Sequence, residues 1–159
     1  MNRKIRWPAL IISLAVPLGF GGAAAMLTKK GMQAFQAMAK PPLTPPQWVF
    51  PVVWTLLYIL MGLACWLVHV SGASEPRREK AVSLYAIQLL MNFAWSIIFF
   101  SMRAYLLAFV WLCVMLFVIA AAAVRFGCID RRAGKLMIPY AVWVAFAGYL
   151  NMGVYVLNR

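Results

Sequence analysis

The sequence has few acidic residues. Its 159 residues include only three, Glu75, Glu79 and Asp130, against 15 lysines and arginines, so the formal net charge is +12. None of the three lies within the long apolar stretches that make up most of the chain. A pair of carboxylates inside a packed site, which many enzymes use for general acid–base catalysis, is therefore not available. No catalytic residue is predicted.

Histidine and cysteine are also scarce. His69 is the only histidine, which excludes ligation of a haem iron by two histidines of one chain. The three cysteines, Cys65, Cys113 and Cys128, form no CxxC pair, the spacing typical of zinc and redox sites. Two of them lie in apolar runs, where a thiol packs as a small apolar group. The sequence predicts neither a metal site nor a required cofactor.

Charge of either sign is rare for a soluble protein. Only 11% of the residues are charged and 65% are hydrophobic, whereas a soluble domain has about a quarter charged residues. Such a chain has too little polar surface to cover a core in water, which predicts a membrane protein. The basic residues lie in short segments between apolar runs, so they cannot form the continuous basic face of a nucleic-acid-binding protein. We expect no nucleic acid as a partner.

Long apolar runs are what the sequence has in abundance. A helix that crosses the hydrocarbon layer needs about 20 apolar residues. Five stretches meet this requirement: 7–27, 48–70, 81–102, 105–124 and 136–157. The first follows basic residues and ends near Ala23–Ala25, as a signal peptide does, but its apolar run is too long for a signal core. The runs show no period-two alternation, which argues against a membrane barrel. The sequence predicts a single all-α domain over residues 1–159, an integral membrane bundle of five transmembrane helices.

The basic residues also predict an orientation, because they are enriched in cytoplasmic loops. Ten lie on the N-terminal side of the expected bundle: Arg3, Lys4, Arg6, Arg77, Arg78, Lys80, Arg125, Arg131, Arg132 and Lys135. Five lie on the other side: Lys29, Lys30, Lys40, Arg103 and Arg159. The N-terminus is therefore expected in the cytoplasm.

The longest connection, residues 28–47, ends in two proline pairs, Pro41–Pro42 and Pro45–Pro46. Proline and the residue before it disfavour helix, so this segment is expected to be stiff and extended before the helix led by Trp48, Trp54 and Tyr58. Residues 32–39 could form a short helix within the connection. A loop of this length beside a bundle is typical of a lid.

The third apolar stretch contains two amides, Gln88 and Asn92, spaced four residues apart on one helix face with Trp95 nearby. Amides in hydrocarbon are costly unless they are hydrogen-bonded, so this face is expected to point inward or at a second protomer. Two interpretations remain open. The amides either hold helices together or line a ligand cavity with aromatic walls.

Several segments resemble the translocator protein family, also called the tryptophan-rich sensory protein or peripheral benzodiazepine receptor family. The resemblance covers nearly the whole chain in order and spacing. The segments that carry it are Lys40–Pro41, Pro45–Pro46, Trp48, Trp54–Thr55, Leu57–Tyr58, Gln88–Leu89, Asn92–Trp95, Phe99–Phe100, Pro139–Tyr140, Trp143, Ala145–Phe146 and Leu150–Asn151.

The resemblance implies a five-helix homodimer in the membrane that binds porphyrins such as protoporphyrin IX or haem as ligands, and sterols in the mitochondrial members. It implies a role in tetrapyrrole transport or in stress regulation. The implied pocket lies among the helices under the first loop. Its walls would include Trp54, Gln88, Asn92, Trp95, Trp143, Ala147 and Leu150. For a bacterial member, unbroken apolar helices favour the inner cell membrane.

Two other functions remain open on this resemblance: light-dependent porphyrin breakdown, and sensing or scaffolding through a partner protein. The chain departs from the family where breakdown would need aromatic side chains. Ala34 and Phe35 stand where many bacterial relatives have a Trp-Tyr pair, and Leu43 stands where many have tryptophan. Losing the loop phenol removes a candidate electron or proton donor, so a receptor or carrier is favoured over an enzyme.

Overall fold

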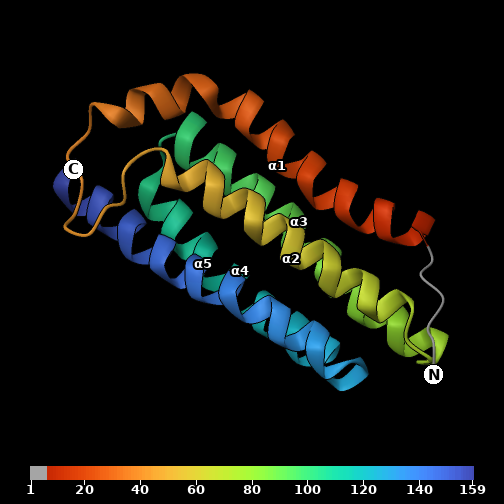
Figure 1. Ribbon diagram of the computed structural model, residues 1–159. Helices are drawn as coiled ribbons and strands as arrows, with labels where there is room; N and C mark the ends of the chain where they lie inside the picture. Colours follow the sequence, from red (N-terminus) through yellow and green to blue (C-terminus); the bar gives the residue numbers. More distant parts are fainter. Residues whose placement is uncertain (1–6) are drawn as a thin grey trace.

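The computed structural model describes residues 7–159, which form long helices (Figure 1). These are α1 (Trp7–Gln36), α2 (Val49–His69), α3 (Glu75–Ser96), α4 (Tyr105–Ile129) and α5 (Arg131–Leu157). Helix α3 continues into a short π-helical segment, η1 (Ile97–Ser101). No strand occurs in the described part of the chain. The prediction of an all-α fold is confirmed.

The helices pack in a ring whose order differs from their order in the chain. Helix α1 contacts α2, α2 contacts α5, α5 contacts α4, α4 contacts α3, and α3 with η1 returns to α1. Helices α1 and α5 do not pack directly on each other. Consecutive helices run in opposite directions, so the start of α1 and the C-terminus of the chain lie at opposite ends of the bundle (Figure 1). This leaves an interior space where α1 and α5 face each other.

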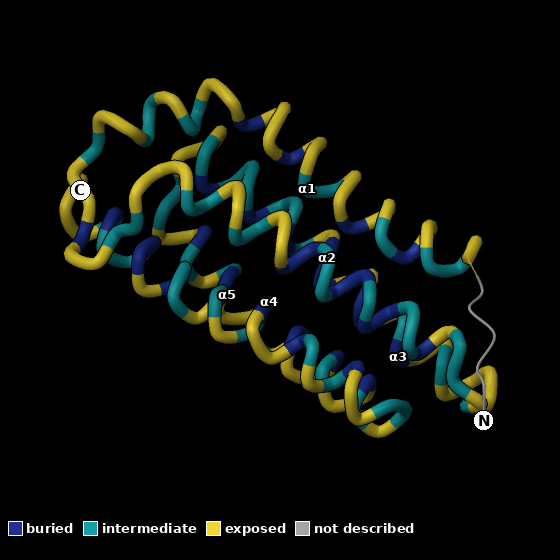
Figure 2. The backbone as a smooth tube through the Cα atoms, viewed as in Figure 1, coloured by how far each residue is buried: buried dark blue, intermediate teal, exposed yellow. Residues whose placement is uncertain are grey.

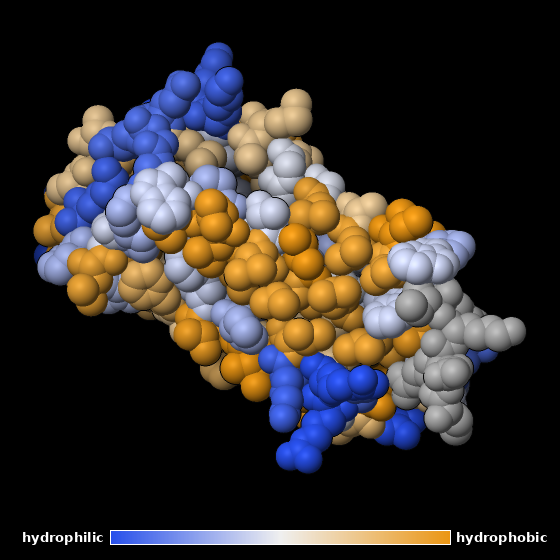
Figure 3. Space-filling model, in the orientation of Figure 1, coloured by the Kyte–Doolittle hydropathy of each residue, from blue (hydrophilic) through white to orange (hydrophobic). Residues whose placement is uncertain are grey.

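All five helices are long and apolar enough to cross a membrane. In the space-filling view, apolar side chains cover the middle of the visible face and hydrophilic ones gather toward both ends (Figure 3). Large apolar side chains such as Ile12, Leu56 and Phe117 are exposed. In water such a surface would be strongly unfavourable, whereas lipid chains match it. The chain is an integral membrane protein.

All helices except α2 extend beyond the predicted spans. Residues 28–36, expected within the first loop, continue α1. Helix α3 begins at Glu75 and α5 at Arg131, five or six residues earlier than the apolar runs. Pro76 occupies the first turn of α3, and the Asp130 side chain accepts a hydrogen bond from the Arg132 N–H at the start of α5. Both are favourable at helix N-termini. An apolar run measures the hydrocarbon thickness, and a helix can continue into water on either side.

The basic residues are divided between the two ends as the sequence indicates. Residues near the α2–α3 and α4–α5 junctions lie at the end where α1 begins, and those near the α1–α2 and α3–α4 junctions lie at the other end (Figure 1). Arg3, Lys4 and Arg6 lie outside the described residues.

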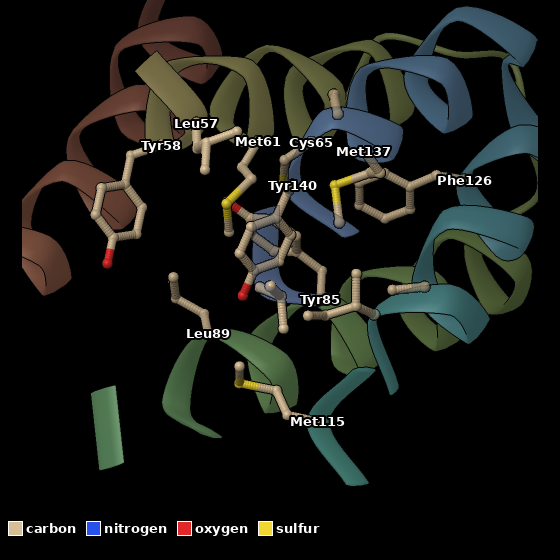
Figure 4. Packing of buried hydrophobic residues seen from close by; sticks show 14 of the residues in the cluster. Leu57, Tyr58, Met61, Cys65, Tyr85, Leu89, Met115, Phe126, Met137 and Tyr140 are labelled. Atoms are coloured by element: carbon tan, nitrogen blue, oxygen red, sulfur yellow. The ribbon is translucent and has the colours of Figure 1, made fainter. Parts of the chain in front are cut away.

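The core lies where α2, α3, α4 and α5 meet. Met61, Met115, Phe126, Met137 and Tyr140 are completely buried there (Figure 4). Buried residues of α1 are fewer and lie at intervals along one side, with exposed residues between them (Figure 2). Helix α1 is therefore attached to a core that the other four helices form.

Candidate functional site

A cavity of about 790 Å³ lies at the end of the bundle that carries the first loop. This volume is within the usual range of small-molecule sites, roughly 300–1,000 Å³. Helices α1, α2 and α5 supply most of its walls, and α3 with η1 supplies the remainder. The first loop, residues 37–48, covers the cavity. We call this loop the strap.

Aromatic side chains dominate the walls. Trp54 of α2 stacks on Tyr58, with ring centroids 5.6 Å apart, and meets the edge of Tyr140 at 6.3 Å. Trp143 of α5 meets Phe50 at 6.1 Å and Phe146 at 5.6 Å. Trp54 and Trp143 are each held by ring contacts with neighbours, so their orientation is fixed before any ligand arrives.

A third aromatic group comes from the end of α3. Trp95 stacks on Phe99 at 5.3 Å, and Phe99 meets Phe100 edge-on at 4.9 Å. The Trp95 indole N–H donates to Asn151 Oδ1 (3.2 Å), and the Asn151 amide donates to the Tyr105 carbonyl (2.7 Å). This chain of hydrogen bonds joins α3, α5 and the start of α4 at the cavity wall. The π-helical turn allows both phenylalanines to line the cavity, and such turns are frequent at functional sites.

Small residues of α1 provide the room. Gly21 lies so close to the ring of Tyr58 that a Cβ atom there would overlap it. Three other residues of α1 both line the cavity and are exposed on the outer surface of the bundle: Leu18, Gly22 and Ala25. Thr55 of α2 also lines the cavity and is exposed. The cavity therefore reaches the surface of the bundle along the seam between α1 and α2, at the level of the lipid chains.

The strap is attached to the far end of α5. The Asn158 side chain makes two hydrogen bonds to Ala39, accepting from its N–H (3.1 Å) and donating to its carbonyl (2.9 Å). The Tyr149 hydroxyl donates to the Pro42 carbonyl (2.9 Å). Gly153 leaves space for the ring of Pro41, which a Cβ atom would contact at 2.5 Å. We call these three contacts the latch.

The tip of the strap is a tight turn. The Thr44 hydroxyl donates to the Pro41 carbonyl (2.7 Å), and Leu43 between them has a φ of +66°. Side chains rarely adopt this left-handed conformation. Leu43 is 80% exposed and does not line the cavity.

Only one formal charge lines the cavity within the described residues, that of Lys40. Its ammonium donates to the Gln36 carbonyl (2.8 Å) and lies 5.3 Å from the ring centroid of Phe35, a cation–π contact. Lys29 and Lys30, which also lie at this end, do not line the cavity. The described residues hold no group of three His, Cys, Asp or Glu side chains that could bind a metal ion.

Five of the seven predicted site residues, Trp54, Trp95, Trp143, Ala147 and Leu150, line this cavity. Gln88 and Asn92 do not. Both are buried one layer deeper, and Asn92 reaches the cavity only through its hydrogen bond to the Tyr58 hydroxyl (2.9 Å). The predicted cavity wall included no residue of α1. The signal that could have indicated one is the spacing of Leu18, Gly22 and Ala25, which places them on one helix face.

The fold and the cavity define a class: five-helix integral membrane proteins with an aromatic, ligand-sized cavity under an extended first loop. Residues 13–157 match the model of the TspO/MBR family. The chain belongs to this family.

Named relatives agree over nearly the full length. The chain is 36% identical over 158 residues to the tryptophan-rich protein TspO of Chlorobaculum tepidum, covering 99% of each chain. It is 33% identical over 150 residues to the protein of the same name from Archaeoglobus fulgidus, covering 94% of this chain and 96% of that one. It is also 33% identical over 149 residues to the human translocator protein, covering 93% of this chain and 88% of the relative.

Proposed function

We propose that the protein is a membrane receptor or carrier for hydrophobic planar ligands, with porphyrins such as protoporphyrin IX or haem as the main class and sterols as a second. The observation that carries the proposal is the cavity of about 790 Å³ with aromatic walls inside a membrane protein. Membership of a family whose members are named for translocation and sensing supports a role in tetrapyrrole transport or in stress regulation.

Shape and charge favour a flat, mostly apolar ligand with an acidic edge. Trp54 and Trp143 line the cavity from different helices, and each offers an aromatic ring to a planar ligand. Lys40, at the strap end, supplies a positive charge that suits a carboxylate such as a porphyrin propionate. The opening between α1 and α2 admits such a ligand directly from the lipid phase.

Removing both tryptophans tests the proposed pocket. We expect Trp54→Ala with Trp143→Ala to weaken protoporphyrin binding about 10- to 100-fold, since each buried aromatic contact contributes about 0.5–1.5 kcal/mol beyond its buried area. Binding is measured by titrating the purified protein and following the porphyrin absorbance band, which does not depend on tryptophan emission. Trp111→Phe is the control, because Trp111 does not line the cavity. Unchanged affinity in the double variant would exclude this pocket.

The same proteins distinguish binding from light-driven breakdown. If the protein is a receptor, porphyrin should bleach under illumination no faster with the wild-type protein than with the double variant. Faster bleaching that requires Trp54 and Trp143 would assign the cavity to an enzyme instead.

We also propose that the end of the bundle where α1 begins faces the cytoplasm of a bacterial cell membrane and that the chain forms a homodimer. Cys128, exposed at the end of α4, reports on orientation. A thiol reagent that cannot cross membranes should label it only after the cells are opened. Labelling in intact cells would contradict the proposed orientation. The dimer is tested by crosslinking, and a result with only monomers would exclude it.

A further inference from the structure

A polar strip runs along the buried face of α3, below the cavity. Tyr85, Gln88 and Asn92 lie three and four residues apart, so they project from the same side of the helix. All three are buried, and Gln88 has no exposed surface. Each has hydrogen-bonding atoms in the middle of a membrane-spanning helix.

Most of these atoms have no partner among residues 7–159. Both amide atoms of Gln88 are buried without a hydrogen bond, as is Oδ1 of Asn92. The hydroxyls of Tyr85 and, on α5, of the fully buried Tyr140 are in the same situation. Buried polar groups of a native protein are nearly always hydrogen-bonded, to protein or to ordered water.

The unpartnered groups belong to α3 and α5, and α2 supplies Tyr58 next to them. Asn92 donates its amide to the Tyr58 hydroxyl of α2 (2.9 Å). In the close view, the Tyr140 ring extends from α5 toward the side of the core where Leu89 of α3 lies (Figure 4). We call Tyr85, Gln88, Asn92 and Tyr140 the polar core.

The chemistry of the polar core selects its occupant. An amide and a phenol can each donate and accept hydrogen bonds, and none of the four residues is charged in its usual state. A charged ligand would have no counter-charge there, and lipid chains offer no hydrogen bonds. A small neutral molecule that both donates and accepts fits every unpartnered atom.

We propose that the polar core is a binding site for ordered water molecules, separate from the ligand cavity. Buried waters typically make about three hydrogen bonds to otherwise unsatisfied groups. None of the four polar-core residues lines the cavity. Tyr58 lies between the polar core and the cavity, because its side chain lines the cavity and its hydroxyl accepts a hydrogen bond from Asn92. The proposal does not depend on which ligand the cavity takes.

Side-chain NMR of glutamine tests it directly. The glutamines of the chain are Gln33, Gln36, Gln47 and Gln88, and the first three are exposed. The full-length protein is labelled with ¹⁵N-glutamine. The Gln88 amide protons should show cross-relaxation with water of the sign that marks a bound water molecule. These protons should not exchange rapidly with solvent. The Gln88 signal is assigned as the side-chain signal pair that is lost in Gln88→Met. If Gln88→Met does not fold, variants of Gln33, Gln36 and Gln47 assign the Gln88 signal by elimination. Water signals at the other three glutamines and none at Gln88 would overturn the proposal.

Conservative variants supply a second readout. Tyr140→Phe removes one hydroxyl from the polar core and keeps the ring, so it should weaken the Gln88 water signal while the protein remains folded. Ser83→Ala, on the exposed side of α3, is the matched control and should leave the signal unchanged. A dry core predicts the reverse for stability: Tyr140→Phe would raise the melting temperature by removing an unpaired buried hydroxyl. That rise, without a water signal in the wild-type protein, would also overturn the proposal.

Discussion

Single small residues determine how closely α1 approaches the cavity. Gly19, Gly21 and Gly22 are close in sequence but differ in surroundings: only Gly21 meets another side chain, the Tyr58 ring, within 4 Å of an added Cβ atom. Tyr58 cannot move freely, because it stacks on Trp54 and its hydroxyl is bonded to Asn92. Glycine at position 21 is therefore a packing requirement.

A pair of alanine substitutions tests this point. We expect Gly21→Ala to destabilise the protein by about 1–3 kcal/mol, the usual cost of overpacking. Gly19→Ala should be neutral or stabilising by up to about 1 kcal/mol, because alanine favours helix more than glycine does. Thermal unfolding in detergent measures both. Equal effects from the two variants would show that α1 does not press on Tyr58.

The residue scale is also where sequence-based prediction was least complete. The helical spacing placed Gln88 and Asn92 on the inward face of α3, and both are indeed buried. Spacing does not give depth, however, and Tyr58 from α2 lies between Asn92 and the cavity. Trp54 and Trp143 were placed at the cavity by the resemblance alone. Asn151 also lines it, four residues after Ala147 on the same helix face. Thr28 lines it too, and only the packing of α1 shows this.

At the scale of elements, the strap is the least embedded part of the site. Its prolines prevent regular secondary structure, so it depends on the latch to α5 for its position. These bonds are exposed, and each contributes only about 0.5–1.5 kcal/mol. We therefore expect that the strap can open without disturbing the helices.

Loosening the latch should change access and leave the bundle intact. We expect Asn158→Ala with Tyr149→Phe to speed hydrogen exchange in residues 37–48 and to raise the porphyrin dissociation rate severalfold. Helix exchange should stay the same, because neither side chain belongs to the core. The matched control is Tyr155→Phe, a residue of the same helix without a bond to the strap. Unaltered strap exchange in the double variant would show that other contacts hold the strap.

How far the elements could be predicted follows from what each pattern measures. Apolar run length identified all five helices, because crossing the hydrocarbon is a strict requirement. The extension of α1 to Gln36 is not needed to cross the hydrocarbon, so apolar run length does not predict it. It is consistent with the helix-forming residues of 28–36 and with Phe35, which packs on Phe99 at 5.5 Å. The π-helical turn η1 depends on packing against α1 and carries no local sequence signal.

At the scale of the whole molecule, the ring order explains why there is a cavity. Because α1 and α5 lie on either side of α2 without packing on each other, the space between them must be filled by side chains or by a ligand. Between positions 21 and 25, the residues of α1 that line the cavity are all glycine or alanine, which are too small to fill it. Sequence alone shows the small residues but not the helix order, and without the order these residues are equally typical of close helix packing.

The most direct test of the proposed function fills the cavity without removing any tryptophan. Ala147 lines the cavity, whereas Ala145 lies on the same helix and is exposed on its outer side. We predict that Ala147→Phe weakens protoporphyrin binding at least tenfold, about 1.4 kcal/mol, and that Ala145→Phe leaves it unchanged. Titration of both variants against the wild-type protein measures this difference. Equal affinity in all three proteins would contradict the assignment of this cavity as the ligand site.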